Sequence, residues 1–134
     1  PSKRKDGIPR IFFDGAGWAF AFEVGVCKYI HENFDVAQTC EVFAISAGNV
    51  SAICLLLDTD PSLLLRAHYP RLWKSMVCAH VREPLFGFCN RLHPIRMLME
   101  ELLPPDFYQK VSGRYHIAIC SWPFLSMRFV SEFS

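Results

Sequence analysis

The longest mainly apolar stretch of the chain covers residues 42–57, and small polar residues interrupt it near its start. Residues 42–45 (VFAI) form a short apolar run that favours a β-strand, and residues 50–57 form a second apolar run that is compatible with a helix. Residues 46–49 (SAGN) break the pattern as a tight turn would. The pattern therefore predicts a strand, a turn that carries Ser46, and a helix that is apolar nearly all round and hence buried.

Apolar periodicity predicts further elements on both sides of this stretch. In chain order, the predicted elements are strand 8–13, helix 22–34, strand 41–45, helix 47–57, helix 62–77, helix 94–103, a helical turn over 106–111, strand 114–121 and strand 127–133. Asp60 and Pro61 should cap helix 62–77, and Pro70 should kink or split it. Segment 78–92 has no period and is interpreted as a packed surface loop, with a cover over an active site or a lipid contact as the alternative. This order predicts an α/β domain with a mainly parallel sheet and a final antiparallel pair.

A serine on a strand–turn–helix corner is typical of a nucleophile elbow, Gly-x-Ser-x-Gly, and here Ala44 and Gly48 stand at the two glycine positions. The sharp turn would lift the Ser46 hydroxyl clear of the sheet, and the following helix would direct its positive dipole end toward that hydroxyl. The N–H of Ala47 would then face a forming oxyanion. The alternative interpretation is a small-residue turn with a buried serine.

A second turn, Asp14-Gly15-Ala16-Gly17, follows strand 8–13 and brings backbone N–H groups close to any ligand. It resembles the start of a dinucleotide fingerprint, but Phe20 stands where the third glycine belongs. An oxyanion hole and a tight turn without a ligand are the other two interpretations.

A serine nucleophile needs a base. The residues that follow Ser46 in the usual acid-then-histidine order are Asp58, Asp60, Asp106 and His116. None of their combinations is convincing: the first two lie one helix away, the third follows a Pro-Pro break, and the histidine lies within a strand. Asp14 is nearer, and we expect it to hold the glycine turn.

Composition limits the classes of function. The chain has 134 residues, enough for one domain, with 51% hydrophobic residues and a net charge of +1, which gives no electrostatic reason to expect nucleic acid binding. Its six cysteines (27, 40, 54, 78, 89 and 120) lie far apart and favour a reducing, intracellular compartment. No spanning segment or signal peptide is expected. Because the chain begins at Pro1 and ends within a strand-like run, we expect it to be part of a longer domain.

Three motifs follow one another along the first half of the chain: Gly15-Ala16-Gly17-Trp18, Glu23-Val24-Gly25-Val26 and Ile45-Ser46-Ala47-Gly48. Residues 102–104, 112–114 and 130–134 form a later set. In this order the motifs resemble the patatin-like phospholipase domain family, in the animal branch that contains adipose triglyceride lipase and adiponutrin.

The resemblance implies a three-layer α/β/α sandwich with a mainly parallel sheet, incomplete at its C-terminus, over residues 8–134, preceded by a basic segment, 1–7. It implies acyl-ester hydrolysis by a Ser-Asp dyad without histidine, metal or cofactor. Ser46 would be the nucleophile, with the aspartate in an Asp-Gly-Gly/Ala motif beyond this chain. The oxyanion donors would be Gly15, Ala16, Gly17 and Ala47.

Two hypotheses follow for the parent protein. It is a glycerolipid hydrolase that acts on acylglycerols or phospholipids, with acyl chains lying near Trp18, Phe20 and Phe22; the present chain, lacking the aspartate, should be nearly inactive. Alternatively, the departures at Ala44 and Phe20 and the missing aspartate mark a non-catalytic module that binds a lipid surface or a partner. Either protein would lie in the cytoplasm or on a lipid droplet or membrane surface, with a protein co-activator as a further partner.

Overall fold

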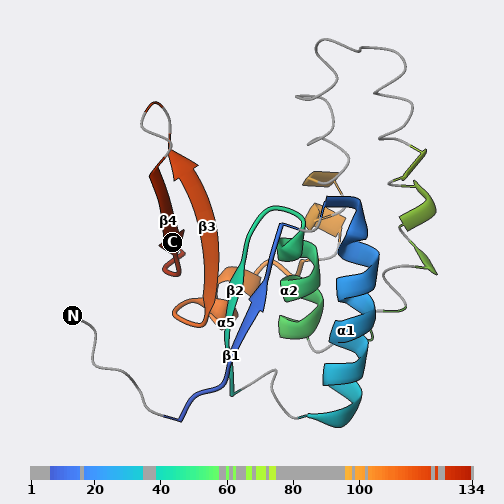
Figure 1. The fold of residues 1–134 in the computed structure, drawn as a ribbon, viewed down its shortest axis with the longest axis horizontal. Helices are drawn as coiled ribbons and strands as arrows, with labels where there is room; N and C mark the ends of the chain where they lie inside the picture. The colour runs from blue at the N-terminus through green and yellow to red at the C-terminus, as the bar shows by residue number, and fades with distance from the viewer. Residues whose placement is uncertain are drawn as a thin grey trace. The chain divides into compact units, whose positions relative to one another are not determined.

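The computed structural model shows a mixed α/β chain (Figure 1) and describes residues 7–15, 17–34, 39–57, 60, 62, 66–67, 69–71, 73–74, 96–97, 99–101, 103–121, 123 and 126–133. The chain divides into two compact units. The first consists of Pro1–Ser62 and Tyr108–Ser134, and the second is Leu63–Phe107. The first unit contains the sheet and both of the turns that the sequence singles out.

The sheet has four strands in the order β1 (Arg10–Phe13), β2 (Glu41–Ala44), β3 (Tyr115–Ser121) and β4 (Ser126–Val130). β1, β2 and β3 are parallel, and β4 runs antiparallel to β3. The predicted α/β class and the mainly parallel sheet are therefore confirmed. Since the ends of parallel strands meet at one edge of a sheet, the turns after β1 and β2 lie at the same edge.

Helices α1 (Phe20–Asn33) and α2 (Gly48–Leu56) pack against each other, and α2 also packs against β1 and β2. Figure 1 shows both helices on one side of the sheet. Val42 and Ala44 of β2 are fully buried on that side. Eight of the nine residues of α2 are buried, as its nearly uniform apolar character predicts.

Several element boundaries differ from the sequence prediction by one to three residues, and two of these differences have an identifiable reason. α1 begins at Phe20 rather than at residue 22, because a short 3-10 turn (η1, Gly17–Ala19) starts at Gly17 with a φ of 52° and leads directly into the helix. β4 ends at Val130, because the carbonyl of Ser131 accepts the Gly113 N–H at 2.6 Å instead of extending the ladder. Gly113 has a φ of 79° and ends the predicted helical turn, α5 (Phe107–Val111).

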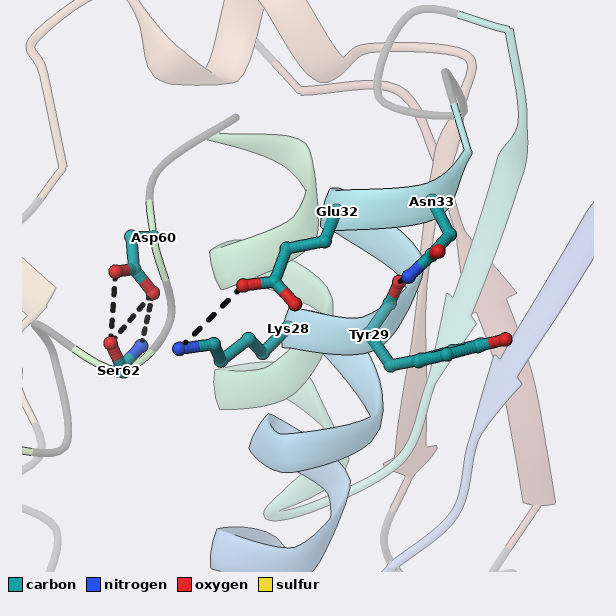
Figure 2. Close-up of polar contacts among 6 residues, drawn as sticks. All are labelled: Lys28, Tyr29, Glu32, Asn33, Asp60 and Ser62. Atoms are coloured by element: carbon teal, nitrogen blue, oxygen red, sulfur yellow. Dashed lines mark hydrogen bonds and ion pairs between the residues drawn. The ribbon is translucent and has the colours of Figure 1, made fainter.

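The predicted cap at Asp60 is present (Figure 2). Its Oδ1 accepts the Ser62 N–H at 2.9 Å, and the Ser62 hydroxyl donates to the same carboxylate at 2.8 Å. These bonds to Ser62 hold the pKa of Asp60 below its usual value. The Lys28 ammonium and the Glu32 carboxylate of α1 lie 3.6 Å apart (Figure 2), and such a surface ion pair contributes little to stability.

In the second unit, every described position from 66 to 74 is helical, and so is every described position from 96 to 101. The two predicted helices are confirmed there, and Pro70 lies within the first of them. The predicted loop 78–92 lies outside the described residues. Within the part of the chain that the structure describes, no helix is both long and apolar enough to cross a bilayer.

Candidate active site

Ser46 occupies a strained, exposed corner between β2, which ends at Ala44, and α2, which begins at Gly48. Its φ is 51°, and among the described residues it is the one non-glycine residue with a positive φ. The left-handed conformation costs an L-residue about 1–2 kcal/mol, so the surrounding structure must hold it in place. A serine held in this way between a strand and a helix has the backbone form of a nucleophile elbow.

A chain of hydrogen bonds fixes the turn from behind. The Gly48 N–H donates to the Ile45 carbonyl at 3.0 Å, and the Asn49 side-chain amide donates to the Ser46 carbonyl at 2.8 Å. The Asn49 side-chain oxygen in turn accepts the Tyr115 hydroxyl at 2.6 Å. Tyr115 belongs to β3 and is 2% exposed, and burial raises its pKa well above the usual range. The first turn of α2 is therefore tied to the centre of the sheet.

Gly48 is sterically required where it stands. A Cβ built on it would lie 2.8 Å from the carbonyl oxygen of Phe13, closer than real Cβ atoms approach backbone oxygen. The N-terminus of α2 thus rests on the end of β1, and that contact brings the serine turn beside the glycine turn.

The glycine turn lies against the serine. A Cβ built on Gly15 would lie 3.6 Å from the Cβ of Ser46, an ordinary van der Waals separation. Gly17 follows with its positive φ, whereas Ala16 lies outside the described residues. Gly15 and Ser46, two of the predicted site residues, are therefore brought together. Ala47 immediately precedes α2, so its amide lies at the positive end of that helix.

Asp14 holds the glycine turn, as expected. Its Oδ1 accepts the Gly15 N–H at 2.7 Å, and its own side chain is exposed. This bond has a chemical consequence, because one amide that could face an oxyanion already has a negatively charged acceptor. Asp14 therefore places a carboxylate within the glycine turn.

The two departures from the elbow and loop patterns are accommodated in the core. Ala44 is fully buried and lies level with Phe13 and Ile117 on the neighbouring strands, so its methyl group belongs to the core. Phe20 is 5% exposed as the first residue of α1. The Phe20 ring is inside the protein, and the expectation that acyl chains lie near Trp18, Phe20 and Phe22 stays a prediction. Phe22 is 76% exposed, and the Trp18 side chain lies outside the described part.

His116 belongs to the opposite side of the sheet. Its ring stacks on Phe43 with centroids 4.1 Å apart, and Phe43 stacks on Phe12 at 4.6 Å. Because side chains alternate along a strand, this column of rings points away from the buried Val42 and Ala44 and from α2. Burial lowers the pKa of His116, and its buried Nε2 has no hydrogen-bond partner in the structure. His116 is therefore a sheet residue rather than the base of Ser46.

The acids considered as partners for Ser46 are not brought to it by the described contacts. Asp60 caps a helix, Asp58 lies outside the described residues, and Asp106 belongs to the second unit. No cluster of three or more His, Cys, Asp or Glu side chains that could hold a metal ion occurs among the residues described.

Sequence reasoning missed a polar contact between α1 and α2. The hydroxyl of the fully buried Ser51 donates to Glu23 at 3.2 Å, and the Cys27 thiol donates to the Ser51 carbonyl at 3.2 Å. The sequence signal for this contact was Glu23, an acidic residue in the first turn of a largely apolar helix. The contact fixes α1 against the helix that carries the serine turn.

Comparison of the chain with models of protein families, with curated proteins and with solved structures found no match in any of the three.

Proposed function

We propose that the chain is part of a serine acyl hydrolase that acts on ester bonds of glycerolipids, with Ser46 as the nucleophile. The observation that carries the proposal is the exposed Ser46 at a φ of 51°, beside a glycine turn where a Cβ built on Gly15 would lie 3.6 Å from the Ser46 Cβ. Strained backbone at a polar, exposed residue is common at functional sites and is seldom kept without a use.

In the proposed reaction, the Ser46 hydroxyl oxygen attacks the ester carbonyl carbon, and its proton passes to an aspartate from a part of the domain outside this chain. The oxyanion forms opposite the Ala47 amide and the amides of the 15–17 turn, as the resemblance implies. The alcohol then leaves with the proton, and water hydrolyses the acyl-serine. The same proposal includes a three-layer sandwich for the complete domain.

The partners follow from the substrate. Acylglycerols and phospholipids are presented at an interface, so we propose that the protein works in the cytoplasm on the surface of a lipid droplet or membrane, with a protein co-activator as a further partner.

Labelling with a fluorophosphonate tests the proposal, because the reagent modifies activated serines. A longer form of the protein that includes the downstream aspartate should be labelled, and Ser46→Ala should abolish the signal. Ser126→Ala is the matched control, since Ser126 is exposed in an ordinary strand and should leave labelling unchanged. Absence of labelling in the longer protein, or labelling that survives Ser46→Ala, would reject the proposal.

A second function is a non-catalytic lipid-surface or partner-binding module. The bond from the Gly15 N–H to Asp14 favours it, because a carboxylate already accepts an N–H that an oxyanion would need as a donor. This function predicts no ester hydrolysis by the longer protein in either the wild-type or the Ser46→Ala form, with unchanged binding to vesicles. If Asp14→Ala produces hydrolysis that depends on Ser46, the elbow is competent and Asp14 restrains it.

A further inference from the structure

A helix of the second unit presents cations and an indole ring to solvent. Arg66, Arg71 and Lys74 are exposed, and Trp73 is 45% exposed. We call these four residues the basic-aromatic face. The Tyr69 ring stacks on Trp73 with centroids 6.3 Å apart, which supports the orientation of the indole.

Helical geometry places the four residues on one side. At 3.6 residues per turn, Trp73, Arg66, Lys74 and Arg71 fall within an arc of about 160°. Ala67 and Pro70, both exposed, lie inside the same arc and carry no charge. No Asp or Glu occurs between residues 61 and 77, so no acid within the segment offsets the three positive charges. The face is therefore positive and partly apolar.

This combination matches the surface of a membrane with anionic headgroups. Trp is favoured at the boundary between headgroups and acyl chains, where the ring is in apolar surroundings and its N–H stays hydrated. Arg and Lys beside it are attracted by the negative surface potential. The exposed Trp73 and the uncharged Ala67 and Pro70 give the face an apolar part, which favours a lipid surface over a nucleic acid.

We propose that the basic-aromatic face binds the surface of anionic phospholipid membranes. This inference deepens the proposed function and rests on it, since an interfacial lipid hydrolase needs a face that holds it at the interface. Vesicle binding does not require a reactive serine, so the two proposals can fail separately.

The test is co-sedimentation of the 134-residue chain with vesicles of phosphatidylcholine containing 30% phosphatidylserine, and with vesicles of phosphatidylcholine alone. Each cation near an anionic surface contributes about fivefold to partitioning, so Arg71→Gln with Lys74→Gln should lower binding about 25-fold. Trp73→Ala should weaken it as well, and 0.5 M salt should reduce binding of the wild type. The matched controls are Lys110→Gln with Arg128→Gln, which remove two exposed cations elsewhere, and Tyr29→Ala, which removes an exposed aromatic ring from α1.

The outcomes are distinct. The proposal is overturned if the wild type and the Arg71/Lys74 variant bind equally well. It is also overturned if the wild type binds both vesicle types equally, or if it binds single-stranded RNA and does not bind vesicles. Circular dichroism and thermal unfolding verify that the exposed-site variants are folded. If the protein binds anionic vesicles selectively but is not labelled by the fluorophosphonate, the proposed catalysis is rejected and the proposed membrane binding by the basic-aromatic face is supported. If the longer protein is labelled but the chain does not bind vesicles, the proposed membrane binding is rejected and the proposed catalysis is supported.

Discussion

Gly48 lies so close to Phe13 that a Cβ added to it would stand 2.8 Å from the Phe13 carbonyl oxygen. The two residues belong to the start of α2 and the end of β1, which are far apart in the sequence. Their backbones touch because a glycine has no side chain to separate them. This approach aligns the serine turn with the glycine turn, so the geometry of the proposed site depends on it.

Gly48→Ala should therefore destabilise the protein. The new methyl group would meet backbone oxygen that cannot move away without shifting α2. We therefore expect the free energy of unfolding to fall by about 1–3 kcal/mol. Gly25→Ala is the matched control: a Cβ at Gly25, in the middle of α1, meets nothing within 4 Å and should stabilise the helix by about 0.5–1 kcal/mol. Urea unfolding measures both, and equal stability of the two variants would contradict the steric argument.

Ser46→Gly should make the protein more stable and chemically inert. Glycine adopts a φ of 51° without the penalty that an L side chain carries, so we expect a gain of about 1 kcal/mol. Ser46→Ala keeps the strain and should leave stability nearly unchanged, while both variants lose labelling in the longer protein. A Ser46→Gly variant that is less stable than Ser46→Ala would show that the positive φ at this position does not destabilise the folded protein.

Local patterns were enough to predict the strand, the turn at Ser46 and the helix after it, because a strand, a small-residue turn and an apolar helix follow one another within residues 42–57. The environment of Phe20 could not be predicted in this way. A bulky residue at a glycine position looks like an obstruction, yet the 3-10 turn before α1 directs Phe20 into the core. Phe20 therefore does not obstruct the glycine turn.

Local sequence patterns likewise do not predict contacts between residues that are far apart in the chain. Tyr115 supports Asn49 across 66 positions, and the pairing of β2 with β3 and the packing of α2 on β2 place them together. The aspartate that the resemblance implies stays a prediction, and so does the patatin-like sandwich.

Tyr115→Phe tests the support of the serine turn. The substitution removes the hydroxyl that donates to Asn49 at 2.6 Å and leaves the ring in place. Because it leaves a part-buried acceptor without that donor, we expect a loss of about 1–2 kcal/mol, together with slower labelling of Ser46 in the longer protein. Tyr29→Phe, at a residue that is 60% exposed, should be neutral in both measurements. Equal stability of the two variants would mean that the Tyr115–Asn49 bond does not brace the turn.

The buried thiols should be inert in the native protein and should weaken it at high pH. Burial raises the pKa of Cys54 to about 12 and also raises that of Cys27 above its ordinary value of 9.0. In the folded state these thiols keep their protons, whereas the unfolded chain loses them near pH 9, so stability should fall as the pH rises from 9 toward 12. Thermal unfolding across that range measures the fall, and Cys54→Ala should make it shallower.

Reagent mapping gives an independent check on the same thiols. Because a reagent must reach the sulfur, a thiol reagent should modify the exposed Cys120 before Cys27 and Cys54, which it should reach only after unfolding. Mass spectrometry of peptides from the native protein identifies the modified sites. Modification of Cys54 at the rate of Cys120 would contradict its burial.

His116 should make the sheet sensitive to mild acid. Burial lowers its pKa from the ordinary 6.5, and the nearby Glu41 opposes this effect while Arg10 adds to it. Below pH 6.5 the unfolded chain binds a proton that the folded protein resists, so stability should fall as the pH drops from 6.5 toward the lowered pKa of His116. The buried Nε2 without a partner agrees with a neutral ring in the folded state.

His116→Phe keeps a ring stacked on Phe43 and removes the titrating group. The variant should therefore unfold with a weaker dependence on pH between 6.5 and 5, while its stability above pH 7 should match or exceed that of the wild type. Urea unfolding at several pH values gives the slope, and NMR titration of the imidazole gives the pKa directly. A measured pKa above 6.5 would reverse the sign of the effect and would require an acid close enough to His116 to outweigh its burial.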